Sequence, residues 1–168
     1  MTLDEMNRLP APQAKTELLK CCGSTRWASL MCNARPFADL DTLIAASDET
    51  WQSLDETDWL EAFRAHPKIG EQKAANPQSA QAQSWSAREQ AGVTMASRET
   101  KDMLAKRNRE YEQRFRFIFI VCASGKSSEE MLEILNSRIG NNHKDELRIA
   151  ADEQRKITRL RLEKLLSP

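Results

Sequence analysis

Long intervals of helix-forming residues, separated by few glycines and prolines, constrain this chain more than any other feature. The 168 residues include five glycines and six prolines, and most of these fall where a helix would end. Alanine, leucine, glutamate, lysine, arginine and glutamine dominate the intervals between them, and these residues have high helix propensity. We therefore predict an all-α fold, a single compact multi-helix domain that spans residues 1–168.

Capping signals place the expected helices along the chain. Thr2-Leu3-Asp4-Glu5 matches a capping box that opens a first short helix. Further helices are expected from near Pro12 to Gly23, over residues 25–33, from Asp39 or Asp41 onward, and over residues 57–65, 86–93, 98–114, 127–139 and 144–166. Residues 67–83 lack a clear period, so we interpret them as an ordered loop or an irregular helix.

One stretch, residues 115–121, has the aromatic and β-branched composition of a strand. Because its context is otherwise helical, we interpret it as an extended, buried connector. The backbone amides of such a connector would be available to bind a ligand.

Composition and charge argue against several classes of function. Lysine plus arginine and aspartate plus glutamate both number 25, so no net field attracts nucleic acid or an anionic membrane. The longest apolar run, residues 118–123, is too short to span a membrane. The four cysteines lack the spacing of a zinc site, and we expect them to be reduced, buried and small apolar side chains. With no secretory signal at the N-terminus, the sequence predicts a cytoplasmic protein without a metal, a nucleic-acid partner or a membrane partner.

Three short polar segments place an ionisable group on a helix face that should be buried. They are residues 66–70, residues 86–90 and Arg161 within residues 157–162. A titratable side chain turned inward costs free energy unless a partner compensates it. We therefore expect the three segments to form one pocket.

His66 lies seven residues after Trp59 and three after Phe63, on the core side of the same predicted helix. It can be a core histidine that a backbone carbonyl satisfies. It can also transfer a proton, because imidazole titrates near neutral pH. His143, in a polar turn, is expected to be exposed.

Ser86 and Glu89 permit two interpretations. Their spacing is that of a capping box, in which Ser86 would begin a helix. Alternatively, Ser86, Glu89, Gln90 and Val93 share one helical face and present hydrogen-bonding groups, a carboxylate and an apolar floor to a ligand. Both interpretations can hold together.

Arg161 lies in the middle of the apolar face of the last predicted helix, whereas Arg159 lies on the outer face. The apolar face is formed by Leu147, Ala150, Ala151, Ile157, Thr158, Leu162 and Leu165. Arg161 therefore needs an internal partner. This partner can be a protein carboxylate such as Glu89, or the carboxylate or carbonyl of a substrate.

Taken together in order and spacing, these motifs resemble the 2-oxo-4-hydroxy-4-carboxy-5-ureidoimidazoline (OHCU) decarboxylases of urate degradation. The motifs are Arg35-Pro36-Phe37 followed by Asp39-Leu40, His66-Pro67, Ser86-x-x-Glu89-Gln90, Tyr111-x-x-x-Phe115-x-Phe117-x-Phe119 and Lys156-Ile157-x-x-Leu160-Arg161-Leu162. The chain departs from the family's aromatic run at Arg116 and Ile118, where the family usually has glycine and proline.

The resemblance implies a cofactor-free, homodimeric enzyme that converts OHCU to (S)-allantoin. The residues that match the family's catalytic positions are His66, Glu89 and Arg161. Those that match its substrate-binding positions are Pro67, Ser86, Ala87, Arg88, Glu89, Gln90, Phe119, Ile120, Val121, Cys122 and Ala123.

Two other functions remain open from the sequence. A non-catalytic helical interaction module would use the polar segments as caps and buried ion pairs. A hydrolase of a related ureido or imidazole compound would share the small-molecule pocket, although the chain shows neither a metal motif nor a nucleophile triad to drive hydrolysis.

Overall fold

The computed structural model of the chain describes residues 1–70, 79–94 and 96–167, and within these it contains ten α-helices and no β-strand. The all-α prediction is confirmed. The helices are α1 (Leu3–Arg8), α2 (Ala11–Cys21), α3 (Thr25–Asn33), α4 (Leu40–Gln52), α5 (Glu56–Arg64), α6 (Ala80–Glu89), α7 (Ala91–Thr94), α8 (Arg98–Phe115), α9 (Ser128–Arg138) and α10 (His143–Leu166). None of these described helices is both long and apolar enough to cross a membrane.

The helices group into two compact units. Unit 1 comprises Met1–Ala62 and Arg155–Pro168, and unit 2 comprises Phe63–Gln154. The last helix, α10, begins in unit 2 and ends in unit 1. Each unit has its own buried residues.

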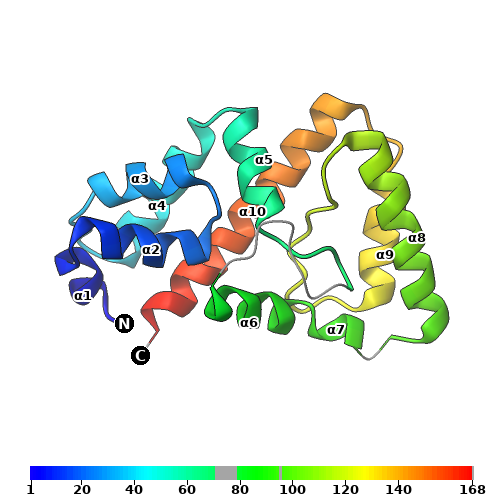
Figure 1. Cartoon of the computed structure of the whole chain (residues 1–168), viewed down its shortest axis with the longest axis horizontal. Helices are drawn as coiled ribbons and strands as arrows, with labels where there is room; N and C mark the ends of the chain where they lie inside the picture. The colour runs from blue at the N-terminus through cyan, green and yellow to red at the C-terminus, as the bar shows by residue number, and fades with distance from the viewer. Residues whose placement is uncertain (71–78, 95, 168) are drawn as a thin grey trace. The chain divides into compact units, whose positions relative to one another are not determined.

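In unit 1, α2 packs beside α3, and α3 packs beside α4 (Figure 1). Their contact is built on fully buried apolar side chains, among them Leu18, Trp27 and Met31. The buried indole N–H of Trp27 donates to the carbonyl of Ser47 at 3.4 Å, so the ring is satisfied as well as packed. The expected caps are present: Thr2 forms the predicted capping box, and Asp39 rather than Asp41 caps α4.

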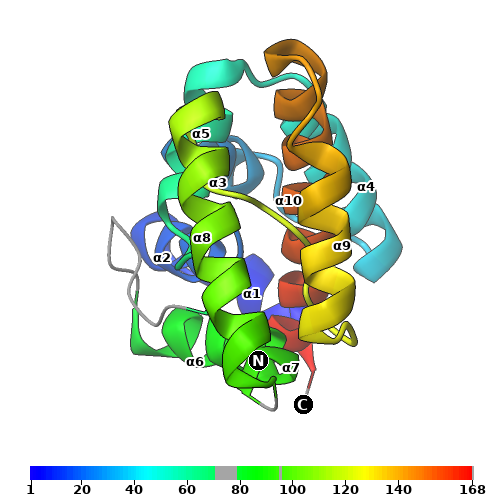
Figure 2. The same cartoon turned by 90° about the vertical axis from the view of Figure 1, so that its right-hand side faces the viewer.

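In unit 2, α8 and α9 lie side by side, as Figures 1 and 2 both show. Between them the chain runs through a connector, residues 116–127, which contains neither helix nor strand. Tyr111 and Phe115 of α8 pack against Phe117 and Phe119 of the connector, at ring-centroid distances between 5.3 and 6.0 Å. The side chains from Phe119 to Ala123 are buried, which confirms the prediction of a buried connector at this point of the chain.

Arg116 ends α8 in the left-handed conformation, with φ 64°. This is the first of the two positions at which the chain departs from the family's aromatic run. The helix ends there, and the strand-like residues that follow form neither helix nor strand.

The start of α6 differs from the prediction. The helix begins at Ala80, where the Ser79 hydroxyl accepts from the amide of Ala82, and not at residue 86. The capping box predicted at Ser86 is therefore wrong, because Ser86 lies inside the helix that Ser79 caps. Residues 80–83, expected to be a loop or an irregular helix, are regular helix. Residues 67–70 and 79 are not helical, and residues 71–78 of that expected loop lie outside the described residues.

Candidate active site

His66 lies two residues after the end of α5, immediately before Pro67, and its side chain is only 8% exposed. Its backbone N–H donates to the carbonyl of Phe63, and the Phe63 ring packs against Phe117 of the connector at 5.5 Å between centroids. The imidazole is thus buried, as the spacing predicted.

The imidazole of His66 makes a hydrogen bond to a side chain of α10. Nε2 of His66 lies 2.7 Å from Oε1 of Gln154, whose side chain is fully buried. The expected structural partner was a backbone carbonyl, whereas the observed one is a side-chain amide. By contrast, His143 at the start of α10 is exposed, as predicted.

The segment from Ser86 to Gln90 lies at the C-terminal end of α6. Ser86 is buried, whereas Ala87 and Arg88 are exposed and Glu89 and Gln90 are half-buried. Because the segment ends a helix instead of beginning one, the free backbone N–H groups expected at a helix N-terminus are absent there. Gln90 supplies a different contact, since its Oε1 accepts from the backbone N–H of Gly70 at 2.9 Å.

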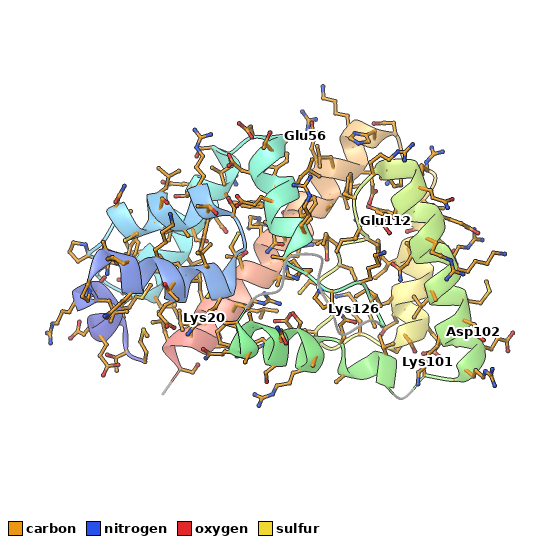
Figure 3. The ribbon with its side chains drawn as sticks, in the orientation of Figure 1. Lys20, Glu56, Lys101, Asp102, Glu112 and Lys126 are labelled. Carbon is orange, nitrogen blue, oxygen red and sulfur yellow. The ribbon has the colours of Figure 1, made fainter. Side chains whose placement is uncertain are left out.

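The backbone of the connector is bound by charged side chains of unit 2. The amide of Cys122 donates to Oε2 of Glu153 at 2.7 Å. The carbonyl of Cys122 accepts from Nζ of Lys126, which is labelled in Figure 3, at 2.7 Å. The carbonyl of Ile120 accepts from Nη1 of Arg138 at 2.8 Å. A substrate that used the amide of Cys122 would therefore compete with the carboxylate of Glu153.

Glu89 also belongs to the surroundings of Cys122. Burial raises the pKa of the Cys122 thiol, the positive charge of Lys126 lowers it, and the negative charges of Glu153 and Glu89 raise it. The charge of Glu89 thus contributes to the electrostatic environment of the Cys122 thiol. In unit 2 two consecutive residues of α10, Glu153 and Gln154, bind the connector and His66 respectively.

A buried ionic network contacts the connector through Arg138. The fully buried carboxylate of Glu146 accepts from Nε and Nη2 of Arg138, at 2.8 and 2.6 Å, and from the hydroxyl of Tyr111. The guanidinium of Arg138 also lies over the ring of Phe119, 4.7 Å from its centroid. A single arginine therefore holds the connector through both a carbonyl and a ring.

A cavity of about 810 Å³ opens beside the His66 loop, between residues 67–70 and helices α6, α7 and α8. Four predicted substrate-binding residues line it, Pro67, Ser86, Ala87 and Gln90. Neither His66 nor Glu89 is among its lining residues. Of the predicted segment at residues 86–90, Ser86, Ala87 and Gln90 thus line the cavity, whereas Arg88 and Glu89 are not among its lining residues.

Arg161 lies in unit 1, where its side chain is 2% exposed, whereas Arg159 is exposed. The helical-wheel assignment of both residues is confirmed. Nη1 of Arg161 donates to the backbone carbonyl of Lys20 at 3.4 Å. The guanidinium also lies near two buried thiols: burial raises the pKa of Cys21 and Cys22, and the positive charge of Arg161 partly offsets both increases.

The cysteines largely match expectation. All four are free, and Cys21, Cys22 and Cys122 are buried, whereas Cys32 is half-buried. Within the described parts of the chain, no group of three or more histidine, cysteine, aspartate or glutamate side chains is arranged to hold a metal ion.

Sequence reasoning missed two residues of the site, Glu153 and Gln154. Glutamate and glutamine are common on exposed helix faces, so neither stood out. A signal was available for Gln154, because it lies four residues after Ala150 and seven before Arg161, on the apolar face of α10.

Comparison with known proteins identifies the relatives of this chain. The family model for OHCU decarboxylase matches residues 7–163. The uric acid degradation bifunctional protein TTL of Arabidopsis thaliana is 40% identical over 147 residues, which are 88% of this chain and 45% of that protein. The 2-oxo-4-hydroxy-4-carboxy-5-ureidoimidazoline decarboxylase of Amia calva is 30% identical over 139 residues, 83% of this chain and 79% of that one. The chain thus spans less than half of the plant relative.

Two solved structures are similar to this one. The crystal structure of an OHCU decarboxylase in the presence of (S)-allantoin superposes with a TM-score of 0.78 and 39% sequence identity, covering 91% of this chain and 99% of that one. The crystal structure of an (S)-allantoin synthase superposes with a TM-score of 0.72 at 16% identity, covering 99% of this chain and 54% of that one. The second similarity concerns the fold alone.

Proposed function

We propose that this chain, which belongs to the OHCU decarboxylase family, decarboxylates OHCU to (S)-allantoin in urate degradation without a cofactor. One observation carries the proposal. The imidazole of His66, the residue that matches the family's catalytic histidine, is buried and held by Gln154 in the same unit as Glu89 and the connector. The relative crystallised in the presence of (S)-allantoin supports the choice of product.

The chemistry of OHCU makes decarboxylation feasible without an added electron sink. Its carboxylate and hydroxyl share a ring carbon next to a C=N unit. When the bond to the carboxylate breaks, CO₂ leaves and the electron pair enters the ring unsaturation, where the ring nitrogen takes up a proton. The hydroxyl then loses its proton while the neighbouring carbon gains one, which creates the stereocentre of allantoin.

We assign the proton transfer to His66, either from the hydroxyl or to the new stereocentre. A positioned general acid or base is worth roughly 10²–10⁴ in rate. Glu89 orients the ring and the ureido group, and Ser86 and Gln90 add hydrogen bonds, together with Pro67, Ala87 and Arg88 of the matching segments. Phe119, Ile120, Val121, Cys122 and Ala123 contribute the buried connector, which excludes water.

Arg161 stays a prediction from the resemblance, as the arginine that binds the substrate carboxylate or carbonyl. Its burial in unit 1 supports this proposal, because a buried guanidinium binds carboxylates and carbonyls specifically. We also propose that both units belong to one OHCU decarboxylase-like domain over residues 1–168. The match of the family model to residues 7–163 supports this proposal.

The experiment is turnover of OHCU generated in situ, followed by circular dichroism for the chiral product and by CO₂ release. OHCU also decays in buffer, so buffer alone is the reference. We expect faster CO₂ release and a growing signal of (S)-allantoin. A rate equal to that in buffer would favour the interaction module, and turnover without CO₂ release would favour a hydrolase.

The assembly and the cellular compartment are part of the proposal. We propose a homodimer, as the family resemblance implies, to be tested by light scattering coupled to size-exclusion chromatography; a monomeric mass would contradict it. We propose a cytoplasmic location, which the four free cysteines suit because a reducing compartment keeps thiols reduced. Fractionation of cells that produce the protein tests this, and recovery outside the cytoplasmic fraction would contradict it.

A further inference from the structure

Gln154 is a fully buried polar residue that none of the family motifs includes. Its amide is the side-chain partner of His66, at 2.7 Å between Oε1 and Nε2. Burying an amide without a hydrogen bond is unfavourable, so a core position on α10 would ordinarily be apolar. A glutamine at this position is explained if its amide binds and orients the imidazole of His66.

The orientation of the amide determines which nitrogen of His66 carries the proton. The oxygen of Gln154 faces the ring and can only accept, so Nε2 of His66 is the donor. In the neutral imidazole the other nitrogen, Nδ1, then carries the lone pair. The same bond persists when the ring is protonated, because Nε2 donates in both charge states.

We propose that Gln154 is a positioning residue that fixes His66 as the Nε2–H tautomer, so that Nδ1 is the nitrogen that exchanges a proton with the substrate. The proposal deepens the function proposed above and rests on it. In the reaction, Nδ1 accepts the proton of the substrate hydroxyl and the ring becomes an imidazolium. Nδ1 then returns that proton to the neighbouring ring carbon, and His66 ends in its starting state.

Several charged groups of unit 2 interact with other parts of the unit. Lys68, two residues after His66, pairs with Glu112 of α8 at 2.7 Å, and Glu153 of α10 accepts from the amide of Cys122. Glu89 of α6 and Lys126 act on Cys122 of the connector. The neutral amide of Gln154 therefore orients the imidazole without adding a further charge.

The first test is nitrogen NMR of His66 in the wild-type protein, assigned by comparison with His66→Asn. We expect Nε2 to be protonated and Nδ1 to be unprotonated in the neutral ring. The opposite tautomer would overturn the proposal. This measurement requires neither a substituted Gln154 nor any catalytic activity.

The second test replaces Gln154 by Glu. A carboxylate in place of the amide stabilises the imidazolium, so His66 should titrate about one pH unit or more higher. A matched control is Thr158→Val, a buried polar residue one turn further along α10, which should leave the tautomer and the titration of His66 unchanged. An unmoved titration in Gln154→Glu would overturn the proposal, as would an equal shift in Thr158→Val.

The third test is turnover of OHCU by Gln154→Leu. With the imidazole no longer fixed, we expect kcat to fall about 10- to 100-fold while KM changes by less than about twofold. A change in KM alone would contradict a positioning role. Absence of turnover by the wild type would instead refute the proposed function, whereas the two NMR tests would still decide the role of Gln154.

Discussion

Nε2 of His66 lies 2.7 Å from Oε1 of Gln154, although the two residues are 88 positions apart in the sequence. The preceding residue on α10, Glu153, binds the amide of Cys122 in the connector. Consecutive residues on a helix point about 100° apart, so a single turn of α10 holds both the histidine and the connector. This turn is the structural element that relates the two predicted parts of the site in unit 2.

Gly92 of α7 lies close to the backbone of the connector, and a substitution there tests this close approach. A Cβ atom at Gly92 would lie 2.2 Å from the carbonyl oxygen of Lys126, so Gly92→Ala requires the backbone to move. We expect a loss of about 1–3 kcal/mol in the free energy of unfolding, measured with denaturant. Gly140→Ala is the control, because a Cβ there meets nothing within 4 Å. Equal stability of the two variants would show that α7 does not lie so close.

Because Glu146 belongs to the buried ionic network, we predict that its substitution lowers the free energy of unfolding by a large amount. In Glu146→Leu the guanidinium of Arg138 would remain buried without its carboxylate, which costs about 3–5 kcal/mol. Glu163→Leu, on the same helix, removes an ion pair to the exposed Arg159 and should cost about 0–1 kcal/mol. Thermal and denaturant unfolding measure both. Similar losses in the two variants would contradict the network's role.

Arg161 and Arg159 differ in burial although they are two residues apart. Arg161→Ala should lower the melting temperature and reduce OHCU turnover at least about tenfold, since it removes a buried cation that donates to Lys20. Arg159→Ala, which breaks a surface pair with Glu163 at 3.1 Å, should change turnover by less than about twofold. Equal effects on activity would be inconsistent with the assignment of Arg161.

The start of a helix could be predicted where the capping side chain and the backbone N–H that it binds lie within one turn of each other. Thr2 and Asp39 each accept from a backbone N–H three residues ahead, so their signal lies within one turn. Ser86 carried the same pattern and was misread, because Ser79 had already started the helix in a stretch without a clear period. A cap motif shows that a residue can begin a helix, and the preceding segment determines whether it does.

The site could be predicted in part. His66 and Arg161 stood out because their neighbours on the same helix face are apolar, which is a local signal. Their partners, Gln154 and the carbonyl of Lys20, come from distant segments. Spacing along α10 could mark Gln154 as buried, but it could not show which residue Gln154 contacts. The hydrogen bond from Gly70 to Gln90 was invisible for the same reason.

Two buried thiols predict a weakening of the fold at alkaline pH. Burial raises the pKa of Cys22 to about 12 and raises the pKa of Cys21 further. Thiols of the unfolded chain ionise near pH 8.5, so above that pH the unfolded state binds fewer protons and is favoured. The neutral thiols contribute fully to the free energy of unfolding below about pH 8.5. This contribution declines as the pH rises toward 12.

The measurement is the free energy of unfolding between pH 7 and pH 10.5 for the wild type and Cys22→Ala. The decline with pH should be shallower in the variant, because one of the two thiols is gone. Parallel curves would mean that Cys22 is not buried as the structure shows.

The central claim is that His66 transfers a proton in a site that decarboxylates OHCU, and the most direct test compares His66→Asn with His143→Asn. Both variants remove an imidazole, but His66 is buried and bonded to Gln154, whereas His143 is exposed. With substrate generated in situ, we predict that His66→Asn retains its helical circular dichroism and loses roughly 10²–10⁴ in the rate of (S)-allantoin formation. His143→Asn should retain the wild-type rate. Formation of chiral allantoin by folded His66→Asn at the wild-type rate would contradict the claim.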